Sequence, residues 1–310
     1  MNDWTSNSDP SLLRIATATV STDDLAASER CYSDFLDYEV VERGLLEASI
    51  AESWGTPAMA GAPYCAMVPQ GEQDVFIRLV ESPGVAGYRP LTTFGWNAFE
   101  IIVDDVHALS RRLASSPFQI IGPPSPLQFM PSIVAMQVAG PSGECLYFTM
   151  ESGDRENSIL PPPAGFVGRT FIVVSAGPDF QRMLRWYVDR FQLRERPVRN
   201  SKVEVIQRAQ GLGPEQTIQL SAIGMRQRGN LLELDGYPTG PGFIAAERPR
   251  PAGSLPPGNA LVTVEVEDFD AHVSSAILPP RKLPGVIYGG RRACTLVGPA
   301  GELLELVEPA

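Results

Sequence analysis

The stretch GPSGECLYF at residues 140–148 recurs with few changes as GPAGELLEL at residues 298–306. In both copies a Gly-Pro-x-Gly turn precedes a short apolar run, a pattern that predicts a turn and then a buried strand. Each copy closes a longer unit of the same order: a strand (96–103 or 261–266), a helix (104–115 or 267–278) and three more strands. Those later strands are expected near 118–121, 133–139 and 145–150, and near 286–288, 292–297 and 303–308. One arrangement found twice at the same spacing indicates an internal repeat.

A second kind of unit precedes each of these two. Residues 13–20 and 170–174 are expected to be strands, and each is followed by an acidic helix start, at Asp24 and at Asp179. Aspartate favours this position because its carboxylate accepts hydrogen bonds from the free N–H groups of the first turn. The chain therefore divides into four βαβββ modules, at 12–84, 94–151, 167–237 and 258–308.

Proline marks the junction between the two halves of the chain. Residues 151–168 contain the run Pro161-Pro162-Pro163 and show no strand or helix pattern, which is typical of a linker. We therefore expect an N-terminal domain of two modules at 11–151, a Pro-rich linker at 152–166 and a C-terminal domain of two modules at 167–310.

Composition excludes several classes of protein. The 310 residues are 44% hydrophobic and 20% charged, enough for one large domain or two smaller ones with real cores. The net charge of -11 argues against nucleic acid and anionic membranes as partners, because phosphate binding needs clustered Lys and Arg. The four cysteines are scattered along the chain, which predicts neither a zinc site nor disulfides. The sequence has no apolar run of membrane-spanning length and begins with polar residues, so we expect a cytoplasmic protein.

These repeats resemble those of the vicinal oxygen chelate superfamily, which includes glyoxalase I, extradiol dioxygenases and bleomycin-resistance proteins. The resemblance rests on the strand–Asp–helix–Tyr-x-Asp pattern at 14–38 and 169–193, and on the two Gly-Pro-x-Gly-Glu strand starts. It implies an α+β fold in which two βαβββ modules pair into an open, curved mixed sheet that cups the substrate. Four modules in one chain would form two such cups, as in the two-domain extradiol dioxygenases.

Metal-dependent members of that superfamily place histidine on a module's first strand and glutamate on its last. Counting seven residues back from each helix-opening aspartate gives Thr17, Ala98, Ile172 and Leu261, and none of them is histidine. The last-strand positions are Arg78, Tyr147, Glu233 and Glu305. His107 and His272, the two histidines of the chain, fall in expected helices as surface residues. We therefore expect no metal and no cofactor, although an oxygen-ligated Mg²⁺ or Ca²⁺ on Glu233 and Glu305 stays open.

Side chains that alternate along the expected strands would line the two cups. In the N-terminal cup the expected substrate-binding residues are Thr17, Arg78, Trp96, Glu100 and Tyr147. In the C-terminal cup Glu233 and Glu305 would be the catalytic pair, because two carboxylates facing one pocket repel and one of their pKa values rises. Arg291 and Arg292 would bind an anionic or phenolic oxygen of the substrate. The competing interpretation is that these charges only brace the sheet.

The preferred function is a metal-independent lyase or isomerase that acts on a small oxygenated compound, with an aromatic one as the expected substrate. Acid–base chemistry would drive an elimination or a retro-aldol cleavage that releases a small aldehyde. The first alternative is a non-enzymatic binding protein of the bleomycin-resistance type, and a scaffold without activity is a further one. A metal-dependent extradiol dioxygenase or glyoxalase is disfavoured. The expected partner is a small-molecule substrate, and a homodimer stays open.

Overall fold

The computed structural model describes residues 9–194 and 196–310, whose strands form two eight-stranded mixed sheets. The first module contains β1 (Leu12–Thr22), α1 (Leu25–Leu36), β2 (Tyr38–Leu45), α2 (Ala48–Ser53), η1 (Pro57–Met59), β3 (Pro63–Pro69) and β4 (Phe76–Glu81). The second contains β5 (Gly95–Val103), α3 (Val106–Leu113), β6 (Gln119–Leu127), β7 (Met130–Ala139) and β8 (Cys145–Glu151). The fold class is α+β, as expected, with each module built around strands.

The other two modules repeat this order. The third contains β9 (Val167–Gly177), α4 (Phe180–Phe191), β10 (Arg199–Ser201), α5 (Glu204–Gln210), β11 (Ile218–Gly224) and β12 (Leu231–Gly236). The fourth contains β13 (Gly258–Val266), η2 (Phe269–Ala271), β14 (Arg281–Lys282), β15 (Arg292–Val297) and β16 (Leu303–Val307). Asp24, Asp105 and Asp179 cap α1, α3 and α4 through their carboxylates, as the sequence predicts.

The fourth module departs from the expected pattern. Residues 267–278 were expected to form a helix, but only the 3₁₀ turn η2 forms there. Asp268 has a left-handed backbone with φ of 50° and makes no capping hydrogen bond, so the helix start that the sequence suggests is not built. The strand expected at 286–288 is also absent, because glycines with positive φ on both sides, Gly285 and Gly289, turn the chain there.

The pairing of modules differs from the expected division into halves. β1 pairs with β13 and β5 pairs with β9, both antiparallel, so the first module joins the fourth and the second joins the third. The segments 11–151 and 167–310 therefore do not each form a sheet. β5 and β13 are buried along their whole length, so an apolar pattern alone cannot indicate which first strand meets which.

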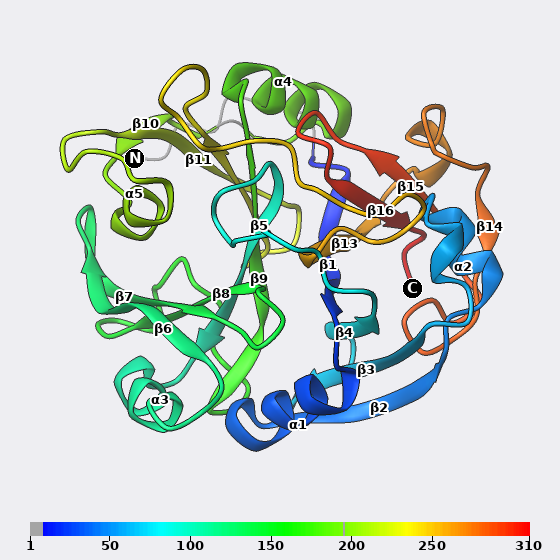
Figure 1. The fold of residues 1–310 in the computed structure, drawn as a ribbon, viewed down its shortest axis with the longest axis horizontal. Helices are drawn as coiled ribbons and strands as arrows, with labels where there is room; N and C mark the ends of the chain where they lie inside the picture. The colour runs from blue at the N-terminus through cyan, green and yellow to red at the C-terminus, as the bar shows by residue number, and fades with distance from the viewer. Residues whose placement is uncertain (1–8, 195) are drawn as a thin grey trace.

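Figure 1 shows the two sheets side by side, with β1 and β4 of one near β9 of the other. The strand orders are β14-β15-β16-β13-β1-β4-β3-β2 and β10-β11-β12-β9-β5-β8-β7-β6. Helix α1 packs on the first sheet, and α3 and α4 pack on the second. We call the face of the first sheet that turns away from α1 the terminal cup. The face of the second sheet that turns away from α3 and α4 is the central cup.

The repeated Gly-Pro-x-Gly-Glu turns join the two sheets. Tyr32 on α1 donates a hydrogen bond to Glu144 Oε1 (3.1 Å), and Tyr187 on α4 donates one to Glu302 Oε1 (2.7 Å). Each pair links a helix on one sheet to a turn of the other sheet. A Cβ at Gly140 would collide with the Glu144 carboxylate, which explains the first glycine of the motif. Burial raises the pKa of both glutamates to about 7.

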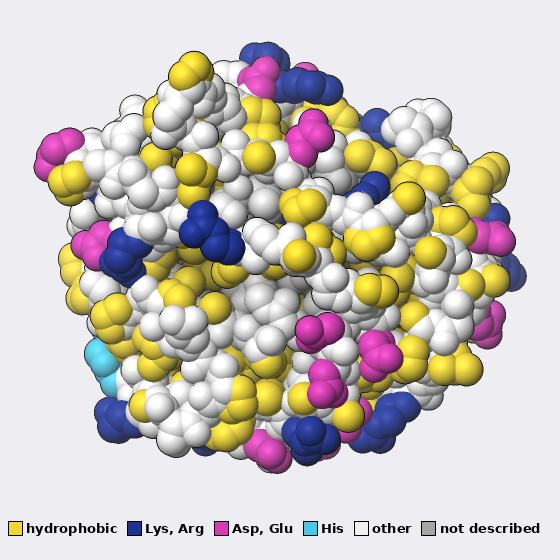
Figure 2. All heavy atoms as spheres, in the orientation of Figure 1, with side chains coloured by type: hydrophobic (Ala, Val, Ile, Leu, Met, Phe, Trp, Pro, Cys, Tyr) yellow, Lys and Arg dark blue, Asp and Glu magenta, His cyan; other side chains and the backbone are white. Residues whose placement is uncertain are grey.

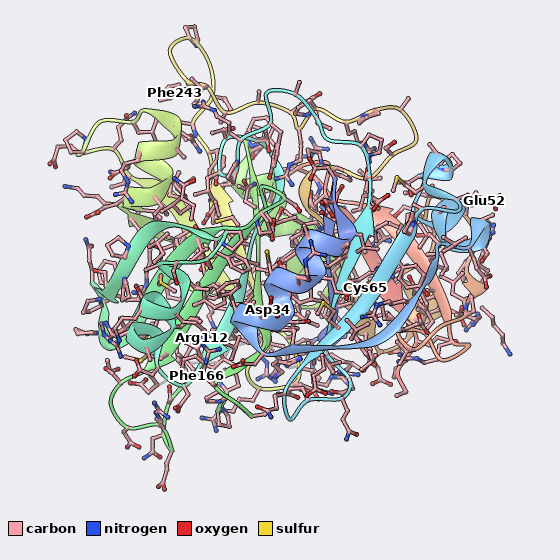
Figure 3. The ribbon with its side chains drawn as sticks, turned by 60° about the horizontal axis from the view of Figure 1, so that its bottom comes forward. Asp34, Glu52, Cys65, Arg112, Phe166 and Phe243 are labelled. Atoms are coloured by element: carbon pink, nitrogen blue, oxygen red, sulfur yellow. The ribbon has the colours of Figure 1, made fainter. Side chains whose placement is uncertain are left out.

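A further contact joins the first two modules on the outer face. Arg112 of α3 donates to Asp37 at the end of α1 (2.8 Å), and its guanidinium lies 4.3 Å from the Phe166 ring centre. Figure 3 shows Arg112 beside Phe166 below the end of α1. On the face drawn in Figure 2, acidic, basic and apolar side chains are interspersed. None of the helices in the described residues is long and apolar enough to cross a membrane.

Candidate functional site

The terminal cup contains a buried ion pair. Arg78 on β4 lies 3.5 Å from Glu305 on β16, measured from Nη2 to Oε2, and neither side chain is more than 1% exposed. The guanidinium of Arg78 also donates two hydrogen bonds to Thr19 Oγ1 (3.0 and 2.9 Å) and one to Tyr288 OH (2.8 Å). Its plane lies 4.3 Å from the centre of the Trp54 ring. Hydrogen bonds, the ion pair and the Trp54 ring therefore hold this guanidinium in place.

Glu305 is equally well satisfied. Trp54 Nε1 donates to Oε1 (2.6 Å), Thr263 Oγ1 donates to Oε2 (2.6 Å), and Tyr288 OH lies 2.9 and 3.0 Å from the two oxygens. These donors come from three separate segments of the chain, and together they hold the carboxylate in one orientation. A carboxylate fixed in this way is poorly suited to exchange protons with a substrate.

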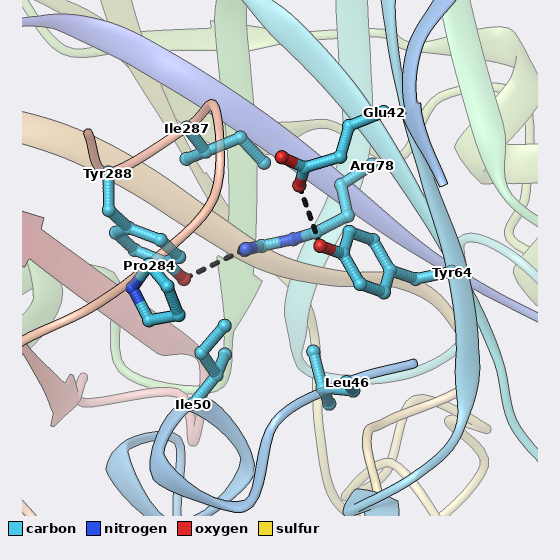
Figure 4. A pocket seen from close by; sticks show the side chains of 8 residues that line it. All are labelled: Glu42, Leu46, Ile50, Tyr64, Arg78, Pro284, Ile287 and Tyr288. Atoms are coloured by element: carbon cyan, nitrogen blue, oxygen red, sulfur yellow. Dashed lines mark hydrogen bonds between the residues drawn. The ribbon is translucent and has the colours of Figure 1, made fainter. Parts of the chain in front are cut away.

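The terminal cup has little free space. Helix α2 and residues 283–288 pack into it and leave a cavity of about 10 Å³, which is room for about one water molecule. The cavity is lined by Glu42, Leu46, Ile50, Tyr64, Arg78, Pro284, Ile287 and Tyr288, as Figure 4 shows. At its rim the Glu42 carboxylate accepts hydrogen bonds from Tyr64 OH (2.6 Å) and from the N–H of Val286 (2.8 Å). The network thus closes this cup.

The expected pairing of Glu305 with Glu233 is wrong. Glu305 lies on β16 of the first sheet, and Glu233 lies on β12 of the second, because the fourth module pairs with the first and not with the third. The two carboxylates therefore cannot serve one reaction or share one Mg²⁺ or Ca²⁺ ion.

Arg291 and Arg292 are also not where the sequence placed them. Arg291 donates to Glu265 (2.7 Å) and to backbone carbonyls of the 287–288 turn. Arg292 binds Glu308 and Asp270 at the surface. Neither reaches the buried Glu305, because Arg292 follows the opposite face of β15 and Arg291 precedes that strand. Both arginines brace the sheet, as the competing interpretation held, but through other carboxylates.

Thr17 and Trp96, expected in the same cup, lie in different parts of the structure. Thr17 on β1 shares the terminal cup with Arg78, because it lies opposite Thr263, whose hydroxyl binds Glu305. Trp96 on β5 points instead into the core between the sheets, where its Nε1 donates to the carbonyl of Leu303 (2.7 Å). A register shift between residues 96 and 98 turns Trp96 away from the face that carries Glu100.

The central cup brings together the remaining expected residues. Glu100 on β5, Tyr147 on β8 and Glu233 on β12 share its face. Glu100 is 9% exposed, and its Oε1 accepts a short hydrogen bond from Thr149 Oγ1 (2.5 Å). Burial raises the pKa of Glu100 to about 7, although the Thr149 hydrogen bond opposes the shift. This carboxyl can therefore hold or release a proton near neutral pH.

Glu233 is the member of this group that solvent reaches. Its side chain is half-buried, whereas the flanking Leu232 and Leu234 on the other face of β12 are fully buried. Burial raises the pKa of Glu233 well above its usual range, and the charges of Asp235 and Glu100 raise it further. The described residues contain no ion pair to any of these three carboxylates.

Asp235 and Tyr237 also belong to the site. Asp235 follows Glu233 by two residues and so faces the same cup, a signal that strand alternation already offers in the sequence. Both side chains are 2% exposed, and neither Asp235 Oδ1 nor Tyr237 OH has a hydrogen-bond partner within the described residues. Burial raises the pKa of Asp235 and that of Tyr237. Buried polar atoms without partners are uncommon in folded proteins and point to a ligand site.

Known proteins match this chain only at the level of structure. No family model matches the sequence, and no curated protein matches it. Glyoxalase I from Zea mays superposes with a TM-score of 0.63 at 16% identity, over 95% of this chain and 92% of its own. A candidate dioxygenase from Bacillus subtilis superposes with a TM-score of 0.63 at 10% identity, over 96% and 86%. The chain has the vicinal oxygen chelate fold. At these identities the likeness concerns the fold alone.

The metal that the vicinal oxygen chelate fold often holds does not fit these residues. At the expected ligand positions the terminal cup offers Thr17, Arg78, Leu261 and Glu305, and the central cup offers Ala98, Tyr147, Ile172 and Glu233. Each set contains a single carboxylate and no imidazole, and one contains a guanidinium. Across the described residues, no group of three or more His, Cys, Asp or Glu side chains could hold a metal ion.

The two histidines lie on the helix-covered side of the fold. His107 is exposed on α3, in agreement with the expectation of a surface residue. His272, expected at a surface too, is 6% exposed and lies 5.2 Å from the Phe191 ring centre. Burial lowers the pKa of His272, and the nearby Arg190 lowers it further. His272 therefore belongs to the packing between η2 and α4.

Proposed function

We propose that this chain is a metal-independent lyase or isomerase, and that it transfers protons on a small oxygenated compound in the central cup. One observation carries the proposal: carboxyl groups without ion-pair partners lie on one buried face, and the pKa of Glu100 is about 7. Carboxyls poised near the working pH are effective as general acids and bases. The terminal cup is a weaker candidate because its Glu305 is held by Arg78 and by hydrogen-bond donors.

Glu100 is the better placed general base and Glu233 the general acid, because the pKa of Glu233 is raised well above its usual range, whereas that of Glu100 is about 7. Glu233 is also the carboxyl of the pair that solvent reaches. In a retro-aldol cleavage, ionised Glu100 takes the proton of a β-hydroxyl group, the C–C bond breaks, and its electron pair moves into the neighbouring carbonyl as an enolate. Protonated Glu233 returns a proton to the enolate carbon, which leaves an aldehyde and a carbonyl product. The hydroxyls of Tyr147 and Tyr237 would stabilise the developing oxyanion.

The test is proton transfer measured directly. The chain is incubated in D₂O with a panel of β-hydroxy ketones and hydroxyaryl carbonyl compounds, and deuterium incorporation and aldehyde release are followed by NMR. Glu233→Gln and Glu100→Gln should each lower the rate by about 10²–10⁴, the usual contribution of a general acid or base. Glu156→Gln, a change at an exposed position, is the matched control and should leave the rate unchanged.

The opposite results are equally specific. If both variants turn over a substrate at the parent rate, the central cup is not the catalytic site. If the chain binds compounds of the panel tightly and transfers no proton, it is a binding protein of the kind that the bleomycin-resistance branch suggests.

A further inference from the structure

Hydrogen-bond acceptors are in excess in the central cup. Glu100, Glu233 and Asp235 bring three carboxyl groups to one face, and the Thr149 hydroxyl is the sole donor that the described structure gives to any of them. Asp235 Oδ1 is buried and accepts no hydrogen bond. A ligand that completes this site must therefore supply donors.

Among the described residues, no Lys or Arg forms an ion pair with the three carboxyl groups. Arg248, whose charge acts on Tyr237, donates instead to Thr93 Oγ1 (2.8 Å) and to the carbonyl of Asn259 (2.7 Å). Its charge favours ionisation of Tyr237, whereas burial raises the pKa of Asp235. The terminal cup differs, because there Arg78 neutralises Glu305. In the part of the chain that the structure describes, the carboxyl groups of the central cup have no such ion-pair partner.

We propose that the natural ligand of the central cup carries a protonated amine, and that the ammonium group binds at Asp235 and Glu233. This inference rests on the proposed function, because it names the class of compound that the same site accepts. An ammonium group has three donors and no acceptor, and so complements the carboxyl oxygens. The rings of Tyr147 and Tyr237 provide aromatic faces of the kind that attract cations.

Other ligand classes fit less well. A carboxylate or phosphate would meet three carboxyl groups and no compensating arginine, so its burial would be strongly unfavourable. A divalent metal ion would need several oxygen ligands at one point, and no such group exists among the described residues. A neutral alcohol could use the acceptors but would bring no charge to them. The amine is the class that supplies both donors and charge.

Binding of a cation should release protons. The ammonium group stabilises the ionised form of Glu233 and Asp235, so their pKa values fall when the ligand binds and protons leave near neutral pH. Cys145, Tyr147, Tyr88 and Tyr237 face the same region and stay protonated there, because burial raises the pKa of each. Glu100 is the other carboxyl of the cup whose proton the ligand could displace.

The experiment compares three probes of one shape: 3-hydroxybenzylamine, 3-hydroxybenzyl alcohol and 3-hydroxybenzoate. Binding to the full chain is measured by calorimetry at pH 6.5 and 7.5 in two buffers of different protonation enthalpy, which gives the number of protons released. We expect the amine to bind with proton release, and the alcohol and the benzoate to bind at least tenfold more weakly. Asp235→Asn and Glu233→Gln should each weaken amine binding by about tenfold to a hundredfold.

Glu302→Gln is the matched control, because Glu302 is also a buried carboxyl with a pKa of about 7 but lies at the inter-sheet turn. It should leave amine binding and proton release intact. Preferred binding of the benzoate or the alcohol, no binding of the amine at millimolar concentration, or binding that Asp235→Asn leaves unchanged would each overturn the proposal. Ca²⁺ alone is a fourth probe, and stoichiometric Ca²⁺ binding lost in Glu233→Gln would also overturn it. These results are separate from proton transfer, which the deuterium assay measures on its own.

Discussion

Glu100→Gln should make the folded protein more stable at alkaline pH. Glu100 is 9% exposed and has no ion-pair partner in the described chain, so its negative charge is unfavourable in the folded state. The amide cannot ionise, has nearly the same shape, and its Oε1 can still accept the Thr149 hydrogen bond. The substitution therefore removes a charge without removing the contact.

The size of the effect follows from the pKa. Burial raises the pKa of Glu100 from 4.5 to about 7, and each pKa unit corresponds to about 1.4 kcal/mol. Because the folded-state pKa lies above the unfolded one, the stability that this carboxyl contributes is complete below pH ~4.5 and is lost as pH rises through ~7. At pH 8 the loss is about 3 kcal/mol, whereas at pH 5 it is below about 1 kcal/mol. For 310 residues, 3 kcal/mol corresponds to about 4–5 °C in Tm.

The assay is thermal unfolding by circular dichroism at pH 5 and pH 8. Glu100→Gln should match the parent Tm within about 1–2 °C at pH 5 and exceed it by about 4 °C at pH 8. The exposed Glu156→Gln serves as the control and should follow the parent at both pH values. Equal Tm values for Glu100→Gln and the parent at pH 8 would refute the claim that burial holds this carboxyl near neutrality. The same variant should be less active, so stability and activity would move in opposite directions.

Two further outcomes follow from the terminal cup and from the ligand positions. Arg78→Met should lower the free energy of unfolding by about 3–5 kcal/mol, because it leaves the buried Glu305 carboxylate without its ion-pair partner. In thermal unfolding, the double variant Arg78→Met/Glu305→Gln should lose less stability than the sum of the losses in the two single variants. Purified protein should contain no stoichiometric iron, nickel, manganese or zinc by elemental analysis, and chelators should leave its activity intact. The reason is that neither cup offers an imidazole at the expected metal-ligand positions. One transition-metal atom per chain, lost together with activity, would contradict this prediction.

The repeats made the modules predictable from sequence, because turn residues and helix caps act locally. The aspartate caps at Asp24, Asp105 and Asp179 and the turn at 140–144 all form where the pattern indicated. The missing helix at 267–278 shows the limit of such signals: Asp268 has the right residue type, but its backbone is left-handed. A residue type alone does not report the backbone conformation around it.

The candidate site was only partly predictable, because strand pairing is a long-range property. Alternation correctly placed Glu100, Tyr147 and Glu233 on inward faces, yet it could not show that Glu233 joins Glu100 and not Glu305. Trp96 was misplaced because a bulge reverses its side chain, and a bulge leaves no clear mark in a single sequence. The partnership of Tyr32 with Glu144 was also hidden, although both residues belong to motifs that the sequence displays.

The order in which the sheets close has a consequence for biosynthesis. The central sheet comes from one continuous stretch, 95–236, whereas the terminal sheet combines the two ends of the chain, 12–81 and 258–307. On the ribosome β1 emerges before the central sheet and its partner β13 only after it, so this edge of β1 stays unpaired while residues 95–236 are made. A chaperone that covers this edge, or rapid pairing with β4, would protect it from other chains. The module that is made first is thus among the last to be completed.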